Sequence, residues 1–200
     1  MTAITLRAGL VVATLATAAC SQAPSAPSDY TDLGEVLDRT ETVLVGFSDY
    51  VDGSGSGEEL TDEDMDGLAD LLAMAYNTPE AVSSRTVGVD FRTDGAFLGF
   101  DDRSGDNAQG AAEPDLFTVE LDIENSRIIA TDVTGAATER RMSGTGFLAG
   151  YVAGRMLTRQ RGAGVGRMAF NNRSVTPRAQ YSSPARARSS VRTGGARVGK

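Results

Sequence analysis

The chain has 200 residues, of which 27 are acidic and 19 basic, and it contains neither His nor Trp. That length allows one or two small domains. The lack of His excludes Ser-His and Cys-His nucleophile pairs and removes the commonest transition-metal ligand. Any enzyme would have to work with carboxylates, Tyr, Ser or Arg, so we expect no enzymatic activity, no cofactor and no bound metal.

Charge is divided sharply along the chain. All acidic residues lie between Asp29 and Glu139, and the six arginines up to that point leave a net charge of −21. From Arg140 to Lys200 there are 13 basic residues and no acidic one, a net charge of +13. This asymmetry predicts either an interaction tail or contact between the two halves.

Residues 1–19 have the pattern of a secretory signal peptide, with Arg7 before an apolar run and small residues at the end. The run is too short to span a bilayer. It ends at Cys20, the only cysteine, and this stretch resembles the lipobox of bacterial lipoproteins. The resemblance implies diacylglyceryl transfer to the Cys20 sulfur, cleavage before Cys20 and acylation of the new amino group. Thr17 departs from the family, which most often has Leu there.

The residue after the cysteine is Ser21 rather than Asp, and the resemblance then implies the outer membrane of a Gram-negative envelope. The alternative is an ordinary signal peptide that leaves a free thiol, although a lone cysteine in an exported protein is unusual. Residues 20–28 are rich in Pro and Ser and are expected to form an extended tether.

The chain from 29 to 135 is predicted to be an acidic α+β domain. Apolar residues at helical spacing predict a helix from Tyr30 to Phe47. A second helix is expected from Thr61, which can form a capping box with Asp64, to the Asn-Thr-Pro that starts at residue 77.

The period then changes to two, which is typical of strands. Residues 87–91 and 96–100 flank a turn and predict one hairpin, and residues 117–123 and 127–133 predict a second. Two helices followed by two hairpins predict a small antiparallel sheet with helices on one face. The opposite face, lined by Asp90, Glu120 and Asp122, is expected to face water.

Two acidic stretches allow a calcium hypothesis. Asp52, Ser54, Ser56 and Glu63 have part of the spacing of an EF-hand loop, but Ser stands where Asp or Asn is usual. A looser set is formed by Asp102, Ser104, Asp106 and Glu113. The simpler interpretation is two acidic loops, the first ending at a helix cap.

Residues 136–170 are predicted to contain a short glycine-zipper helix. Gly146, Gly150 and Gly154 are four residues apart, which on a helix forms a groove for close backbone approach. The pattern weakly resembles the glycine-zipper lipoproteins of bacterial outer membranes, although Arg155 interrupts the apolar run. The helix is expected either to pack on the sheet or a partner, or to lie at a membrane interface with its arginines on phosphates; a flexible linker is the third alternative. The residues expected to make membrane or partner contact are Gly146, Gly150, Gly154, Arg155, Arg159 and Arg161.

Residues 171–200 are rich in Arg, Ser, Gly and Pro and are predicted to be disordered. Arginine binds phosphate and carboxylate in a bidentate manner, so the expected contacts are anionic lipid, lipopolysaccharide, an envelope protein or the acidic domain itself, and not nucleic acid. The sequence thus predicts a non-enzymatic envelope lipoprotein anchored through Cys20. The alternatives are a calcium-dependent binding module and a hydrolase that uses carboxylates.

Overall fold

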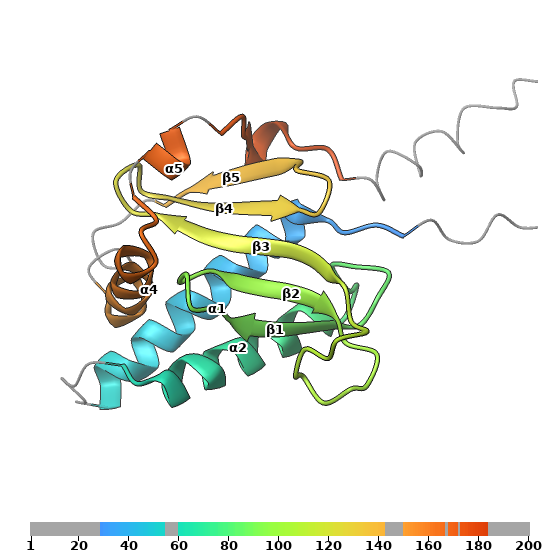
Figure 1. The fold of residues 1–200 in the computed structure, drawn as a ribbon, viewed down its shortest axis with the longest axis horizontal. Coiled ribbons are helices and arrows are strands. Elements are labelled where there is room, and N and C mark those ends of the chain that lie inside the picture. Colours follow the sequence, from blue (N-terminus) through green and yellow to red (C-terminus); the bar gives the residue numbers. More distant parts are fainter. Residues whose placement is uncertain (1–28, 55–59, 143–149, 167, 172, 184–200) are drawn as a thin grey trace, which may run out of the picture.

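The computed structural model describes residues 29–54, 60–142, 150–166, 168–171 and 173–183. The signal peptide, Cys20, the tether, Ser56, Gly146 and the chain from residue 184 onward lie outside the described residues. Figure 1 shows one layer of helices packed against a twisted sheet, with further short elements at one end of that sheet and beyond its last strand.

Two long helices open the domain, as predicted. α1 runs from Leu33 to Ser54, seven residues beyond the expected end, and α2 runs from Asp62 to Asn77. The predicted capping box is present: the Thr61 hydroxyl accepts from the Asp64 N–H, and the Asp64 carboxylate accepts from the Thr61 N–H. These bonds satisfy amides that a helix start otherwise leaves without partners.

The sheet has six strands in the order β1-β2-β3-β4-β5-β6. The first four form the two predicted antiparallel hairpins, with neighbouring strands paired in sequence order. Their bounds are Val87–Phe91 for β1, Phe97–Asp101 for β2, Asp115–Asp122 for β3 and Arg127–Asp132 for β4. The fold is therefore α+β, as the sequence predicts.

The sheet continues past residue 135, the expected end of the acidic domain. β5, Ala137–Arg141, pairs antiparallel with β4, and the short β6, Thr176–Pro177, pairs parallel with β5. β5 contains only one apolar residue in Ala-Thr-Glu-Arg-Arg, so alternation of apolar residues could not indicate it.

One face of the sheet packs on α1 and α2 and forms the core. Alternate strand residues such as Val89, Phe97 and Val119 join helix residues such as Leu37 and Leu72 in one buried apolar cluster. Strand pairing brings Gly99 opposite Phe117, and a Cβ on Gly99 would lie 2.4 Å from the Phe117 ring. The glycine thus leaves the space that this aromatic ring fills.

The opposite face differs from the prediction that it is wet. Asp90 is exposed, but Glu120 is half-buried and Asp122 is only 2% exposed. The prediction is wrong for the latter two because arginines cover them: Arg127 lies 2.7 Å from Asp122, and Arg173 pairs with both oxygens of Glu120.

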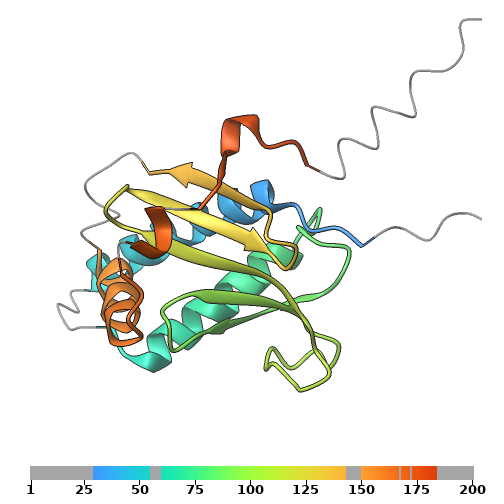
Figure 2. The ribbon, with the colours of Figure 1, turned by 45° about the horizontal axis from the view of Figure 1, so that its top comes forward.

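The basic half of the chain supplies three short helices. α4 spans Tyr151–Gly162, α5 spans Met168–Asn171, and the 3-10 helix η1 spans Arg178–Gln180. The prediction of disorder from residue 171 is therefore wrong for residues 173–183, which we call the C-terminal strap. Figure 2 shows this segment running beside β5 toward the start of α1. Carboxylates of the body hold it in place, which a prediction based on low apolar content cannot anticipate.

Candidate functional site

The glycines of the predicted zipper do not form the packing face of α4. Gly150 is the N-cap residue, and Gly154 is exposed with nothing within 4 Å of the position of a Cβ. The face buried on the domain consists of Val152, Ala153, Met156 and Gln160, of which the first three are apolar side chains that exclude more water than glycine does. Of the alternatives for this segment, the structure shows a helix packed on the domain, but with its other face inward.

Arg155 and Arg159, expected at a membrane or partner, both pair with Asp62 at the start of α2. The guanidinium of Arg159 also lies 4.4 Å from the centre of the Phe91 ring and donates to the carbonyl of Phe91 at 3.1 Å. Hydrogen bonds from these two arginines lower the pKa of Asp62. Arg161 is exposed, so it is the one of the three that solvent reaches freely.

The first calcium set does not have the loop geometry that the hypothesis requires. Asp52 and Ser54 lie in the last turn of α1, while Glu63 is exposed in the first turn of α2. An EF-hand loop needs its first positions in a turn around the ion rather than in a helix. Ser56 lies outside the described residues.

In the second calcium set, the carboxylates of Asp102 and Glu113 accept hydrogen bonds from backbone amides of their own loop. Asp102 accepts from the N–H groups of Gly105 at 2.7 Å and Asn107 at 3.1 Å. Glu113 accepts from three amides, including Ser104 at 2.9 Å and Gly110 at 2.7 Å, and these bonds lower its pKa. Among the described residues no group of three or more His, Cys, Asp or Glu is placed to hold a metal ion. The loop between β2 and β3 is thus ordered by carboxylate–amide bonds.

The structure shows a different site, on the first turns of α1, where Gly34 and Asp38 bind the guanidinium group of Arg178. The Arg178 guanidinium lies 2.7 Å from an oxygen of Asp38 and donates to the Gly34 carbonyl at 3.0 Å. A Cβ on Gly34 would lie 2.7 Å from the central guanidinium carbon. Gly34 therefore provides the space in which the guanidinium lies flat on the helix.

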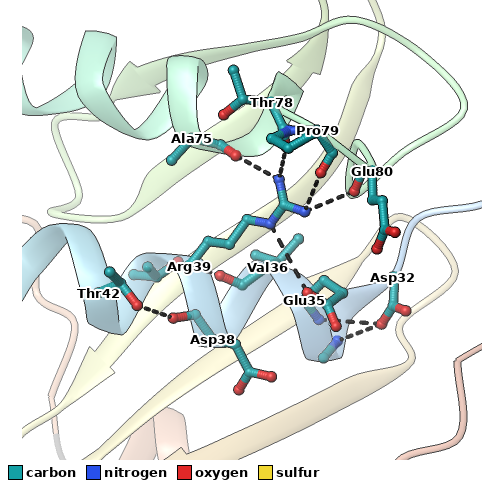
Figure 3. Close-up of polar contacts among 12 residues, drawn as sticks. Asp32, Glu35, Val36, Asp38, Arg39, Thr42, Ala75, Thr78, Pro79 and Glu80 are labelled. Atoms are coloured by element: carbon teal, nitrogen blue, oxygen red, sulfur yellow. Dashed lines mark hydrogen bonds and ion pairs between the residues drawn. The ribbon is translucent and has the colours of Figure 1, made fainter.

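Two arginines share Asp38. Arg140 of β5 pairs with the second oxygen of Asp38 and reaches Glu41 at 2.5 Å. The hydrogen bond to Asp38 raises the pKa of Arg178 and outweighs its partial burial. Figure 3 shows that Asp38 and Arg39 leave α1 on different sides. Arg39 donates to carbonyls at the end of α2, at 2.6 Å to Ala75. One side of α1 thus binds arginines through Asp38, and the other side binds backbone carbonyl oxygens through Arg39.

Further contacts fix the strap along β5. The Thr138 hydroxyl donates to the Thr176 carbonyl at 2.8 Å beside the β5–β6 bridge. The Tyr181 hydroxyl accepts from the Leu33 N–H at 3.3 Å, at the start of α1. Burial of Tyr181 raises its pKa. A cavity of about 700 Å³ remains beside the strap, lined by Asp38, Glu41, Glu139, Arg140, Arg141, Pro177, Arg178, Ala179 and Tyr181.

A buried ion cluster supports this region from the sheet. Arg127, with 11% of its side chain exposed, lies between Asp122 and Glu139 on the face away from α1. Burial opposes the charge on Arg127, but its hydrogen bonds to the two carboxylates outweigh burial and raise its pKa. Arg127 also donates to the Phe170 carbonyl at 3.2 Å and so ties α5 to the sheet.

A second cavity, of about 280 Å³, lies where the strap ends. It is lined by Tyr30, Asp32, Glu35, Glu80, Ala81, Ser83 and Ser183. The Asp32 carboxylate caps α1, accepting from Gly34 at 3.0 Å and Glu35 at 3.2 Å (Figure 3). The two described ends of the chain thus share one cavity.

Five carboxylates of the described residues have hydrogen bonds that favour their ionised form. Each one whose pKa departs from its ordinary value has a lowered pKa: Asp62, Asp64, Asp101, Asp106 and Glu113. A carboxyl group acting as a general acid near neutral pH would need a raised pKa. What this arrangement can do is bind cations, above all guanidinium groups.

Sequence reasoning missed Gly34 and Asp38 as a site. The signal available was their spacing of four residues on a helix together with an oppositely charged half of the chain. It could not identify Arg178 as the ligand. Within the described residues no helix is both long and apolar enough to cross a membrane. No family model, curated protein or solved structure matches this chain.

Proposed function

We propose that this chain is a non-enzymatic lipoprotein of a Gram-negative envelope, held at the outer membrane by acyl chains on Cys20. Its folded body has a structural or interaction role there. The basic residues after the strap contact anionic lipid, lipopolysaccharide phosphates or an envelope protein. The lipobox-like stretch that ends at Cys20 supports the anchor, and the following observation supports the second contact.

The observation that carries the proposal is that the chain enters and leaves the folded body at the same place. Tyr30 and Ser183 line one cavity, and the Leu33 N–H donates to the Tyr181 hydroxyl at 3.3 Å. In Figure 1 both described ends lie on the right-hand side of the domain. Residue 20 is nine positions before Asp29, within about 32 Å of it even when fully extended.

The chain after Ser183 adds five basic residues and no acidic one, namely Arg186, Arg188, Arg192, Arg197 and Lys200. Each basic residue near an anionic membrane surface contributes about 1 kcal/mol of attraction. A lipid and a polybasic segment that start from the same end of a domain can act on one membrane together. The acidic body is negatively charged like the anionic membrane surface, so that surface repels it.

Labelled palmitate tests the anchor. Cells that produce the wild-type chain should incorporate label and keep the protein in the membrane fraction, whereas Cys20→Ser should lose both. Ser21→Ala is the matched control and should retain both. A Cys20→Ser protein that still takes up label and stays with the membrane would refute the proposed anchor.

Vesicle flotation tests the second contact. The mature chain from residue 20, without lipid, should float with vesicles that contain anionic lipid, and removal of residues 184–200 should abolish this. Binding should weaken steeply between low and high salt because the attraction is screened over about 10 Å at 0.1 M. Equal flotation with neutral vesicles, or binding that salt does not change, would contradict an electrostatic contact.

Neither alternative function is favoured by a specific observation. The two calcium sets have the geometries described above, and the carboxylates with shifted pKa values have lowered ones. Isothermal calorimetry with calcium and the unlipidated chain is a direct check. Binding heat at micromolar calcium would support the alternative that this chain is a calcium-dependent binding module.

A further inference from the structure

The C-terminal strap is bound to the domain as a ligand is bound. Its arginines insert their guanidinium groups into separate carboxylate sites, Arg173 at Glu120 on the sheet and Arg178 at Asp38 on α1. Its backbone adds two residues beside β5. We call the surface that receives it, formed by Gly34, Asp38, Glu120 and Thr138, the strap groove.

Ion pairs and hydrogen bonds hold the strap, together with Tyr181, which packs partly buried against the apolar core. Thr176, Pro177, Ala179 and Gln180 are exposed, and only Ser183 is buried. The space of about 700 Å³ beside the strap is open to solvent, so water and salt reach the ion pairs that line it. Ion pairs with access to solvent weaken as salt rises, so this segment can leave the groove without unfolding of the core.

The chain that leads to the strap can redirect it. Gly162 ends α4, Gly164 and Gly166 follow it within four residues, and Gly164 has a φ of +73°, a conformation that other residues rarely adopt. Backbone rotation in this stretch can point α5 and the strap away from their own domain. Such a hinge before a terminal element is what segment exchange between identical chains requires.

We propose that the strap groove also receives the strap of a second copy of this chain, so that two copies exchange C-terminal segments. Each copy carries one strap and one groove, so exchange keeps the contacts of Arg173 with Glu120, Arg178 with Asp38 and Thr176 with Thr138. The closed monomer is favoured at low concentration because its own strap is tethered, which corresponds to an effective concentration of about 1 mM for short flexible links. Exchange is therefore favoured where copies are concentrated and the ion pairs are transiently screened. This inference stands on contacts of the described residues and does not depend on lipid attachment.

A pair of complementary variants tests the exchange. Gly34→Ala places a methyl where the Arg178 guanidinium lies, so the guanidinium has to shift away from Asp38 and the Gly34 carbonyl, and it leaves the strap intact. Arg178→Gln weakens the strap and leaves the groove intact. Each variant alone has a weakened contact both within a chain and between chains. In a mixture, the intact strap of the first can enter the intact groove of the second.

The only cysteine allows the measurement by energy transfer. Chains from residue 20, produced without lipid, are labelled at Cys20 with donor on the Gly34→Ala variant and acceptor on the Arg178→Gln variant. Only the mixture can form the charge-assisted bonds of Arg178 in an unaltered groove. Association in the mixture should therefore be about tenfold or more tighter than association of either variant with itself. Energy transfer should rise in the mixture and not in either variant labelled with both dyes.

Matched controls exist in the same elements. Gly46→Ala adds a methyl on α1 where nothing lies within 4 Å, and Arg141→Gln removes an arginine that is 79% exposed. The Gly46→Ala and Arg141→Gln mixture should show no more transfer than the wild-type chain. Circular dichroism on each variant verifies folding before mixing.

A second measurement uses the wild-type chain alone, in case a variant does not fold. Donor- and acceptor-labelled chains are mixed at high concentration, exposed to 1 M NaCl and returned to low salt. Transfer should develop after this treatment and be lost on long incubation at high dilution. The exchange is refuted if transfer stays at the background level both in the complementary mixture and after the salt treatment, or if the control pair matches the complementary pair.

Discussion

The two faces of the sheet are covered in different ways. Toward α1 and α2 the contacts are apolar, with Leu72 and Val119 as examples. On the other face Arg127 and Arg173 cover Asp122 and Glu120, and at the edge beside α1 the strap lies on Asp38. Apolar burial responds only weakly to NaCl and does not titrate, whereas arginine–carboxylate pairs weaken as salt rises and are lost in acid, where the carboxylates take up protons. The folded core and the attachment of the basic half should therefore respond to different conditions, and the following experiments separate them.

The largest effect is expected from a cavity on the apolar face. Leu72→Ala, at a fully buried position of α2, should lower the free energy of unfolding by about 3–5 kcal/mol. Leu71→Ala, at the neighbouring position with 43% exposure, is the control and should cost far less. Urea unfolding followed by circular dichroism gives both values. The difference should be the same in low and high salt, and a strong salt dependence would contradict an apolar face.

The next largest effect is expected at the centre of the ion cluster. Arg127→Met removes the cation between two carboxylates whose side chains are 3% and 8% exposed, so both are left buried without their partner. We expect a loss of about 3 kcal/mol at neutral pH. Arg141→Met, at 79% exposure, should change little. Equal stability of the two variants would mean that the cluster does not hold the far face together.

A smaller effect with a defined pH dependence is expected at Asp101. Its burial opposes ionisation, but hydrogen bonds from Arg103 and Arg85 outweigh burial and lower its pKa below 3.8 in the folded chain. The unfolded chain therefore binds more protons in acid, and stability from this group is present above pH 4 and is lost as pH falls through the lowered pKa. Asp101→Asn should cost about 1–2 kcal/mol at pH 7, and the difference from wild type should shrink toward pH 3. Urea titrations at several pH values check the trend, and a difference that grows in acid would overturn it.

The smallest effect is expected where the ion pairs are most exposed. Asp62→Asn removes the acceptor shared by Arg155 and Arg159 and should lower the melting temperature slightly at low salt. Because Asp62 has 59% of its side chain exposed, the difference should disappear in 1 M NaCl. Asp66→Asn, elsewhere on α2, is the control. A salt-independent loss would instead indicate that α4 depends on Asp62 for its packing.

Much of the fold follows from local patterns, and most of the site does not. Helical spacing, the Thr61–Asp64 capping box and two alternating hairpins predicted α1, α2 and β1 to β4, because these signals arise between residues close in the chain. β5 was missed because a strand of polar residues carries no alternation. The strap was expected to be disordered because low apolar content usually prevents burial, yet here ion pairs replace burial.

The α+β class, the division of charge and a lone cysteine after a small-residue run can all be read from the amino-acid order alone. That order also indicated that the basic half has the acidic half as one possible partner. The pairing of each arginine with its carboxylate is known only from the folded chain: Arg178 binds at Gly34 and Asp38, and Arg173 binds at Glu120. The reason is physical. Charge acts at long range and without direction, so a sequence shows only that attraction exists, whereas bidentate geometry and the missing Cβ of Gly34 depend on positions that folding alone brings together.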